Sequence, residues 1–472
     1  MAEPTKLKNL QNAPCGIEED RIPLCVDLDG TLIKTDVLWE SVLQLLIRNP
    51  LYVFVLPLWV IRGKASLKWH VAQHIQLDIT SLPYRKDLLL LLQKELARGR
   101  HLVLATACHS SQAQRIAAHL HLFTEVLATD KVNLRGRAKA HCLVERFGHG
   151  SFDYAGNSRE DVPVWREARK AIVVGKQEPS ISACLMRALR PHQWLKNVIV
   201  FVPLLTAHKL NELHLLLQAA LAFSAFCLCA AAMYVLNDLV DLEADRNHFS
   251  KNCRPFAAGD LPIIIGVVAV PMLLALSGSL ALLLPPRFSV VLVLYAVIAS
   301  TYSWRLKRIP LLDSFCLAGL YTIRLAAGHE ATHVAYSPWL LIFSMFIFLG
   351  LALLKRFQEL LSLVTRKQLA SGGRGYTTAD TEMVALLGST SSYLAVLVMA
   401  LYVNSEQVRP LYAHPMRLLF ICPLLLYWVS RIWLLAHRGK LHDDPVLFAA
   451  RDATSYAVGA LTVLIMWLAT VP

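Results

Sequence analysis

The pattern of hydrophobic and polar positions changes near residue 180 of this 472-residue chain. Before that point, short apolar runs alternate with helix-like segments and polar loops, as is typical of an α/β domain. After it, apolar runs of bilayer-spanning length dominate, which predicts an all-α membrane bundle. We expect nine spans, near 193–208, 213–237, 262–285, 288–303, 311–328, 337–354, 384–403, 415–436 and 453–471. The first, fourth and fifth are marginal in length and could be re-entrant or tilted.

One further apolar stretch, LYVFVLPLWVIR at 51–62, lies in the first part of the chain. It is too short to cross a bilayer, and Pro57 interrupts it. Two interpretations remain open for it. It could be an interfacial helix on a membrane surface, or a buried helix that covers the first domain.

Composition and charge favour a multi-pass membrane protein. Hydrophobic residues make up 55% of the chain and charged residues 17%, which is little polar surface for a soluble protein of this length. The net charge is +13, but the basic residues form short clusters between apolar runs, unlike a nucleic-acid groove. Alternate loops carry 17 and 3 Lys or Arg residues. The positive-inside rule therefore predicts that the N-terminal region is cytoplasmic. We expect the membrane to be a bacterial inner membrane.

Cysteine spacing and the N-terminus add two expectations. The ten cysteines contain no Cys-x-x-Cys pair, which favours reduced thiols over a zinc site or a disulfide framework. Residues 1–20 lack the apolar core of a cleaved signal peptide and are expected to be disordered. The predicted domains are 21–178, of α/β class, and 179–472, the membrane domain.

The segment RIPLCVDLDGTL (21–32) predicts a buried strand that ends in a loop. It places Asp27 and Asp29 at the carboxyl end of the strand, where open α/β sheets locate their sites. Their spacing allows one carboxylate to attack while the other serves as acid or base. Gly30 permits a tight turn, and Thr31 could orient Asp27.

Asp-x-Asp-Gly-Thr resembles the first motif of the haloacid-dehalogenase-like (HAD) phosphatases, and the family's other motifs follow in order. They are HLVLAT ending at Thr106, GRAKAH with Lys139, and FDYAGNSRED ending at Asp161. The resemblance implies a Rossmann-like domain with a helical cap at 36–98. It also implies that Thr106 and Lys139 bind the phosphoryl group, and that Asp27, Asp29 and Asp161 bind Mg²⁺. Asn157 stands where the family usually has an acid, so one negative charge is lost and phosphatase activity stays open.

A second acidic motif, Asn237-Asp238-x-x-Asp241-x-x-x-Asp245, leaves an apolar run and enters a basic loop. On a helix the three aspartates would share one face. Their mutual repulsion calls for a cation, and Mg²⁺ commonly bridges carboxylates to substrate phosphates. Lys251 and Arg254 could bind the phosphate oxygens. The motif therefore predicts a magnesium–diphosphate site at the inner membrane face, with a solvated acidic loop as the alternative.

This motif and its Lys/Arg-Pro loop resemble the first motif of the UbiA-type intramembrane prenyltransferases, and residues 302–328 resemble the second. The resemblance implies that Asp238, Asp241 and Asp245 are catalytic metal ligands. It implies substrate binding by Asn237, Lys196, Lys251, Arg254, Tyr302, Lys307, Asp313 and Arg324. The second motif carries one clear acid, Asp313, where many members carry two. Arg324 could alternatively snorkel to an interface.

Four further segments, at 189–205, 353–360, 374–376 and 442–452, resemble the decaprenyl-phosphate phosphoribosyltransferase branch. That branch implies transfer of 5-phosphoribose from phosphoribosyl diphosphate (PRPP) to a polyprenyl phosphate lipid in the bilayer, after which the first domain could remove the 5-phosphate. One alternative is an ordinary prenyltransferase that moves a prenyl group from a prenyl diphosphate to an aromatic or other acceptor. Another is a non-enzymatic membrane scaffold. None of the three uses nucleic acid.

Overall fold

The computed structural model describes residues 5–6, 22–130, 133–175, 179–248, 250–365, 375–441 and 444–471. For residues 5, 6 and 64 it describes the backbone and not the side chain. The expected disorder of 1–20 concerns residues that, apart from 5–6, lie outside this description. Contacts divide the chain into two units. The first unit combines Met1–Ala188 with Asp238–Val268, and the second combines Leu189–Asn237 with Ala269–Pro472.

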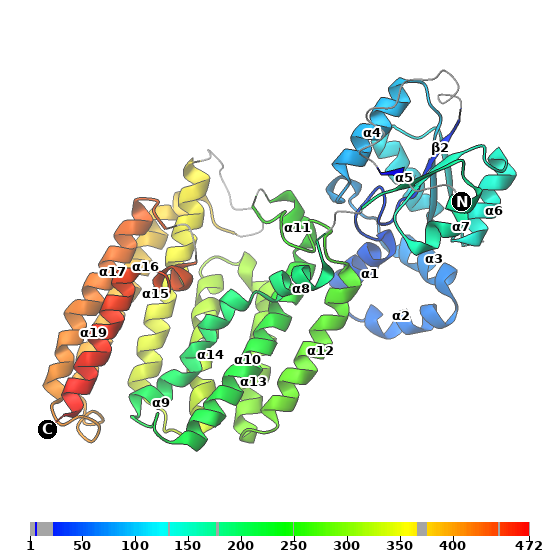
Figure 1. The fold of residues 1–472 in the computed structure, drawn as a ribbon. Helices are drawn as coiled ribbons and strands as arrows, with labels where there is room; N and C mark the ends of the chain where they lie inside the picture. The colour runs from blue at the N-terminus through cyan, green and yellow to red at the C-terminus, as the bar shows by residue number, and fades with distance from the viewer. Residues whose placement is uncertain are drawn as a thin grey trace. The chain divides into compact units, whose positions relative to one another are not determined.

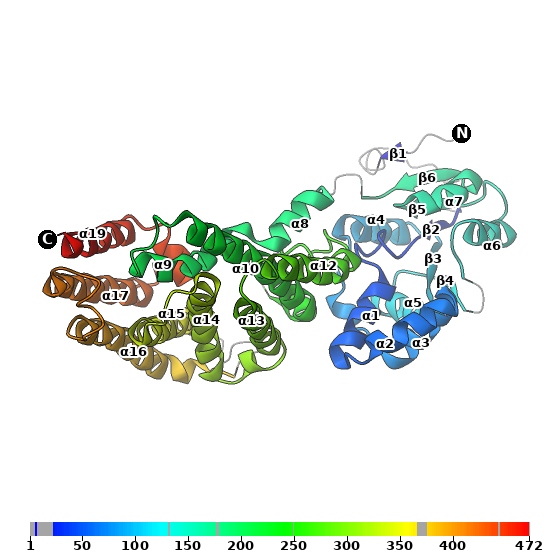
Figure 2. The same ribbon diagram turned by 90° about the horizontal axis from the view of Figure 1, so that it is seen from below.

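A parallel sheet of six strands, in the order β1-β6-β5-β2-β3-β4, organises the first unit (Figure 2). The strands are β1 (Thr5–Lys6), β2 (Leu24–Val26), β3 (Leu102–His109), β4 (Glu125–Thr129), β5 (Asp153–Gly156) and β6 (Lys170–Val173). From β2 the chain adds β3 and β4 on one side and then crosses to β5 and β6 on the other. The order therefore reverses between β2 and β5, and ligands of open α/β sheets bind at such a reversal, beyond the carboxyl ends of the strands.

The first unit also contains helices (Figure 1). They are α1 (Val37–Arg48), α2 (Tyr52–Ile61), α3 (Lys64–His74), η3 (Ile79–Ser81), α4 (Lys86–Ala97), α5 (Ser110–Leu120), α6 (Arg137–Phe147), η4 (Arg159–Asp161), α7 (Val162–Glu167), α8 (Ile181–Leu189) and α11 (Leu242–Asn247). Alternate strand residues face opposite sides, so Leu24 and Val26 enter one core and Cys25 enters the other. The region 36–98, expected to form a cap, is helical, but Leu88 of α4 packs into the sheet's own core.

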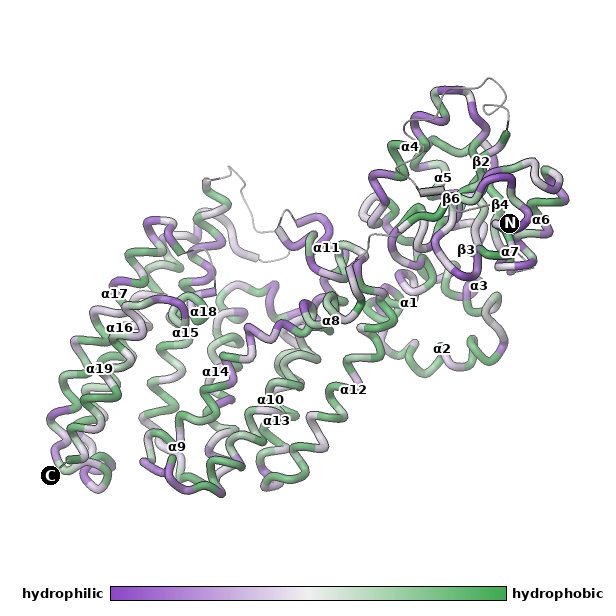
Figure 3. Tube along the Cα trace, viewed as in Figure 1, coloured by the Kyte–Doolittle hydropathy of each residue, from purple (hydrophilic) through white to green (hydrophobic). Residues whose placement is uncertain are grey.

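Long helices dominate the second unit, and α10 and α12 extend into the first. The elements are η5 (Pro191–Phe201), α9 (Val202–Thr206), α10 (Leu213–Val240), α12 (Ile263–Ala281), α13 (Pro286–Trp304), η6 (Leu306–Arg308), α14 (Leu312–Thr332), α15 (Pro338–Thr365), η7 (Thr378–Asp380), α16 (Thr381–Val403), η8 (Pro415–Phe420), α17 (Ile421–His437), α18 (Pro445–Ala449) and α19 (Ala453–Thr470). Within the described chain, seven segments are long and apolar enough to cross a membrane, and green dominates them in Figure 3. They contain α10, α12, α13, α15, α16, α17 and α19.

Two of the nine predicted spans are therefore not confirmed. The segment near 193–208 is a 3₁₀ helix, η5, followed by the five-residue α9, so no continuous helix of spanning length forms there. The segment near 311–328 does form a long helix, α14, but Asp313 and Arg324 make it more polar than a lipid-exposed span. Both side chains are buried inside the bundle. Apolar composition alone could reveal neither the 3₁₀ geometry near 193–208 nor the burial of the charged side chains of α14.

Candidate functional sites

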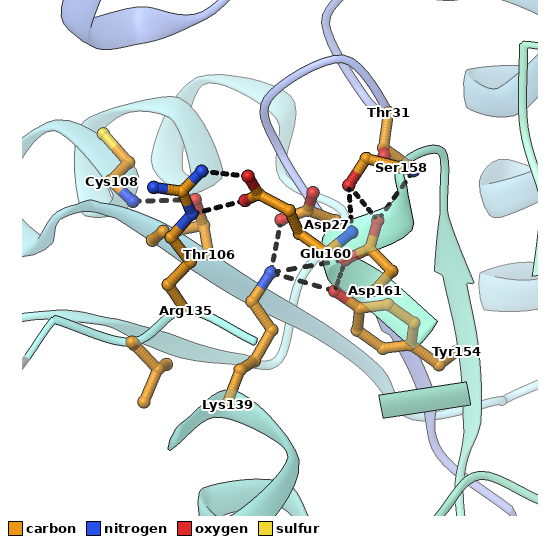
Figure 4. Close-up of polar contacts among 12 residues, drawn as sticks. Asp27, Thr31, Thr106, Cys108, Arg135, Lys139, Tyr154, Ser158, Glu160 and Asp161 are labelled. Carbon is orange, nitrogen blue, oxygen red and sulfur yellow. Dashed lines mark hydrogen bonds and ion pairs between the residues drawn. The ribbon is translucent and has the colours of Figure 1, made fainter. Parts of the chain in front are cut away.

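The carboxyl edge of the sheet gathers Asp27, Lys139, Tyr154 and Asp161 into one network (Figure 4). Lys139 of α6 donates from Nζ to Asp27 Oδ1 at 2.7 Å and to the Tyr154 hydroxyl at 2.9 Å. Tyr154 in turn donates to Asp161 Oδ1 at 3.0 Å. All four side chains are buried. The sequence predicted three of these residues, and Tyr154 was missed because its hydroxyl lies within an apolar strand.

Asp161 accepts several hydrogen bonds from the loop that follows β5. Its Oδ2 accepts hydrogen bonds from Asn157 N at 3.1 Å, Ser158 N at 3.0 Å and Ser158 Oγ at 3.1 Å. Together with the bond from Tyr154, these contacts use most of the accepting capacity of a carboxylate. Asp161 therefore organises the loop, and its predicted role as a metal ligand stays a prediction.

Asn157, which departs from the HAD pattern, lies against the turn after β2. Gly30 has φ +72°, and a Cβ at this position would lie 2.3 Å from Asn157 Nδ2. Only glycine adopts this backbone and leaves room for the amide. Thr31, expected to orient Asp27, instead donates to Asn157 Oδ1 at 3.4 Å. The substituted position is thus in direct contact with the Asp-x-Asp-Gly-Thr turn.

Thr106 lies within β3, which continues to His109, and a lysine that the sequence analysis did not predict contacts the following residue of this strand. Thr106 is buried, and its Oγ1 accepts from Cys108 N at 3.0 Å. Lys68 of α3 donates from Nζ to Ala107 O at 2.6 Å and to Asn133 Oδ1 at 3.0 Å. Burial lowers the pKa of Lys68, and Asp29 and Asp36 partly oppose this shift. No motif marks Lys68 in the sequence, because it lies in a helical segment remote from β3.

The two aspartates of the β2 turn favour a cation nearby. Burial raises the pKa of Asp27, and Lys139 offsets only part of this effect. Burial, followed by the charge of Asp36, raises the pKa of Asp29 well above its ordinary value, although Val37 N donates to Asp29 Oδ1 at 2.9 Å. A bound Mg²⁺ would lower the pKa of both groups. In the described part of the chain, no three or more His, Cys, Asp and Glu side chains are gathered as a metal site, so substrate oxygens or water would complete the shell.

The second acidic motif lies at the end of α10, and its geometry corrects one expectation. Helix α10 ends at Val240 and α11 begins at Leu242, so the aspartates do not share one continuous helix. The carboxylates of Asp238 and Asp245 nevertheless converge on Arg254, whose Nη1 lies 3.0 Å from Asp238 Oδ1 and 2.5 Å from Asp245 Oδ2. Asp241 lies at the break between the helices and accepts a backbone bond from Asp245 N at 2.8 Å.

This arrangement has the donor chemistry of a magnesium site. Asp238 and Asp245 are both buried, and burial raises the pKa of Asp245 while Arg254 opposes the rise. Two carboxylates already meet at one cationic nitrogen, and Mg²⁺ in phosphate-handling sites commonly takes one or two carboxylates plus phosphate oxygens. Lys251 lies on the same loop, where its carbonyl accepts from Arg254 N at 3.0 Å. The residues present therefore fit the ion.

The acidic segment is also held by the α/β part of the same unit. Arg246, next to Asp245, donates to Glu40 of α1 at 2.5 Å (Nη2 to Oε1) and 3.3 Å (Nη1 to Oε2). Both side chains of this ion pair are buried. Lys34 Nζ lies 2.9 Å from Asp260 Oδ1. The sequence did not indicate these pairs, since each joins residues more than 200 positions apart.

Asp313 of the second unit lies in a buried network. Its Oδ2 lies 2.5 Å from Arg356 Nε, and Tyr376 donates to its Oδ1 at 2.7 Å. Arg356 Nη2 also donates to the Tyr302 hydroxyl at 3.4 Å. The structure thus brings Tyr302 and Asp313 together through Arg356. Tyr376 ends the segment 374–376, whose Arg374 lies outside the described residues.

Arg324 is buried at the centre of the second unit, so it does not snorkel. It donates to Asn197 Oδ1 at 2.8 Å, to the Tyr295 hydroxyl at 3.0 Å and to Leu320 O. Its guanidinium also lies over the ring of Tyr321. Lys307 donates to Asn237 Oδ1 at 3.5 Å. The predicted binding of phosphate by these two cations stays a prediction.

Lys196 forms an ion pair with Asp444, which the sequence analysis included only within the segment 442–452. Asp444 Oδ2 lies 2.9 Å from Lys196 Nζ and 3.0 Å from Lys355 Nζ. Burial would raise the pKa of Asp444, but the two lysines outweigh it and hold that pKa well below its ordinary value. His442 and Asp443 of the same segment lie outside the described residues. Asp444 therefore fixes two lysines of the second unit.

The chain belongs to the UbiA prenyltransferase family, whose model matches residues 198–451. It is thus an integral membrane protein of a transferase family. The match includes the acidic motif from Asn237 to Asp245, the Asp313 network and Asp444.

Individual proteins extend this comparison. An uncharacterized protein, y4nM of Sinorhizobium fredii, is 37% identical over 93% of this chain and 90% of its own length. The decaprenyl-phosphate phosphoribosyltransferase of Mycobacterium tuberculosis is 32% identical over 47% of this chain and 75% of its own. A UbiA homologue from Archaeoglobus fulgidus, solved bound to DMAPP and Mg²⁺, aligns with 61% of this chain and 98% of its own at 17% identity and a TM-score of 0.46.

Proposed function

We propose that this protein is a magnesium-dependent transferase that moves 5-phosphoribose from PRPP to a polyprenyl phosphate. The observation that carries the proposal is the convergence of Asp238 and Asp245 on one guanidinium nitrogen of Arg254. Buried carboxylates beside an arginine suit a diphosphate with its cation. The choice of PRPP is supported by the similarity to the mycobacterial decaprenyl-phosphate phosphoribosyltransferase. The proposed setting is a bacterial inner membrane with the α/β region cytoplasmic.

In this reaction a phosphate oxygen of the lipid attacks the anomeric carbon of PRPP, and the bond from that carbon to the diphosphate breaks. Asp238 and Asp245 would hold Mg²⁺ together with substrate oxygens, and the ion would neutralise charge on the departing diphosphate. Arg254 and Lys251 would bind diphosphate oxygens. Asp313, already paired with Arg356, would position Tyr302 through that arginine.

For the first unit we propose a HAD-like phosphatase that removes the 5-phosphate of the product. Asp27 at the strand reversal would attack the phosphorus, and Asp29 would handle the proton of the leaving alcohol. Lys139 and Thr106 would bind the phosphoryl oxygens. Water then releases inorganic phosphate from Asp27. The connected network of Asp27, Lys139 and Asp161 supports this role, while Asn157 removes one charge from the expected metal site.

The transferase is tested with purified protein in lipid nanodiscs, PRPP and polyprenyl phosphate. Expected products are diphosphate and a ribosylated lipid, both abolished by EDTA. Asp238→Asn should lower diphosphate release at least about 100-fold, the scale on which lost electrostatic stabilisation acts. Glu243→Gln, an exposed acid on α11, is the matched control and should leave release unchanged. Absence of ribosylated lipid with the wild-type protein contradicts the proposal.

The second candidate is transfer of a prenyl group from a prenyl diphosphate, which the family's own description favours. The same motif would then ionise an allylic diphosphate. Parallel incubations with prenyl diphosphates and aromatic acceptors separate the two reactions. Diphosphate release from these donors, and none from PRPP, would select the second candidate. Full cellular function of Asp238→Asn would instead favour a scaffold role.

A further inference from the structure

Helix α2 presents apolar side chains to the outside of the first unit. Leu51, Phe54, Leu58 and Ile61 are 67%, 76%, 59% and 82% exposed, and Val53 and Val60 are also exposed. Exposed apolar surface gathered in one place marks a contact site in soluble parts of proteins. The ten residues of α2 include no charged side chain. In Figure 3, green stretches alternate with paler ones along α2.

The inner side of α2 is held firmly, so its exposure is a fixed feature of the fold. Trp59 is buried and stacks on His70 of α3, with ring centroids 4.8 Å apart. Tyr52 packs edge-on against His74, at 5.5 Å between centroids. These contacts fasten α2 to α3 along one side. The remaining sides stay apolar and outward-facing.

Charge around α2 indicates what covers it. From Ser41 to Leu77 the chain has no Asp or Glu, while Arg48, Arg62, Lys64 and Lys68 are basic. Arg48 and Arg62 are exposed just before and just after α2. An apolar helix flanked by exposed arginines complements a membrane surface, where acyl chains accept the apolar face and anionic headgroups accept the cations. A second copy of this chain is a poorer partner for α2, because the arginines that flank α2 in the two copies would repel each other.

We propose that α2 is an interfacial anchor that inserts its apolar side chains into a bilayer containing anionic lipids. The chain is an integral membrane protein, so a bilayer is present at high effective concentration for any tethered apolar surface. This inference does not depend on which diphosphate the transferase uses. It assigns the segment 51–62 to the first of its two sequence interpretations, the interfacial helix.

The test uses the full chain in nanodiscs of phosphatidylcholine and phosphatidylglycerol. Phe54 is replaced by the photocrosslinker p-benzoylphenylalanine, and Leu90, 59% exposed on α4, receives it in a matched control. Mass spectrometry after irradiation should find roughly tenfold more lipid adduct at position 54, because an inserted side chain touches acyl chains continuously. Equal adduct at both positions overturns the proposal. So does a crosslink from position 54 to a second protein chain.

A second measurement removes any dependence on the crosslinker. Hydrogen–deuterium exchange of residues 51–62 should be slow in nanodiscs and become faster in the double variant Phe54→Asp/Ile61→Asp. Both positions are exposed, so neither change disturbs a packed core. Leu90→Asp is the control and should leave exchange of 51–62 as it is in the wild type. Unchanged exchange in the double variant would contradict membrane insertion of α2.

Discussion

Arg356 and Asp313 lie side by side in the core of the second unit with almost no exposure to solvent. Placing two charges there is costly, and their attraction offsets the cost only while both are present. Tyr376 donates a hydrogen bond to Asp313 Oδ1, and Arg356 Nη2 donates one to the Tyr302 hydroxyl. The single acid of the second motif is therefore neutralised by a residue from α15.

We expect Arg356→Leu to destabilise the protein by about 3 kcal/mol, because Asp313 would remain as an uncompensated buried charge. The double variant Arg356→Leu/Asp313→Leu should recover much of this loss, since the buried carboxylate is then gone and Glu359, which also pairs with Arg356, is partly exposed to solvent. Thermal unfolding in detergent measures both. Equal melting temperatures for wild type and Arg356→Leu would contradict a stabilising pair.

Asp444 gives a pH dependence whose sign follows from its environment. Its pKa in the folded protein lies below the value of about 3.9 expected in the unfolded chain. The stability that it contributes is therefore complete above that unfolded value and is lost as pH falls toward the folded pKa. In Asp444→Asn this loss should be absent, and stability near neutral pH should be lower. Melting temperatures of the wild type and Asp444→Asn, measured between pH 7 and pH 3, would show this difference. If the two melting temperatures fell in parallel as the pH is lowered, the predicted contribution of Asp444 would be refuted.

At the scale of elements, helix α1 links the β2 turn to the acidic segment. Asp29 accepts from Val37 N at the start of α1, and Glu40, less than one turn later, pairs with Arg246 beside Asp245. Because Glu40 and Arg246 are buried, this pair fixes the direction of α11 relative to α1.

Glu40→Gln is therefore expected to loosen α11. Hydrogen exchange of residues 241–247 should rise, and transferase activity should fall mainly through kcat, because Asp245 would be less well positioned. The exchange measurement stands even if the substrate proposal fails. The double variant Glu40→Arg/Arg246→Glu, which swaps the two charges, should restore much of the protection of residues 241–247 from hydrogen exchange. Such a recovery would show that the ion pair itself matters, and not only the loss of one charge. Additive effects of the two single variants would show that the residues are not coupled.

The sequence predicted the local elements better than the contacts between them. The β2 turn, Lys139 and the spans of α10 to α13 could be inferred, since strand ends, motif spacing and apolar length are local signals. The 3₁₀ geometry of η5 and the break at Asp241 could not, because both depend on surrounding packing. Lys68, Tyr154 and Glu40 were missed for a related reason. Each acts through a partner far away in sequence, and no spacing rule connects them.

At the scale of the whole molecule, the family match and the packing divide the chain differently. The UbiA model matches 198–451 as one stretch, yet Asp238–Val268 packs with Met1–Ala188. The loop that carries Asp245 and Arg254 is thus part of the transferase by sequence and part of the α/β unit by contact.

Deletion of residues 1–178 is consequently expected to impair the transferase, although every residue proposed for that reaction remains. Arg246 would lose Glu40, and Asp260 would lose Lys34, so exchange of residues 241–262 should rise and diphosphate release should fall. The control is Asp27→Asn in the full chain, which should abolish phosphate release by the first unit and leave diphosphate release unchanged. A truncated protein with wild-type exchange and activity would show that the acidic loop holds its form without the α/β region. The two reactions would then share a chain without sharing structural support.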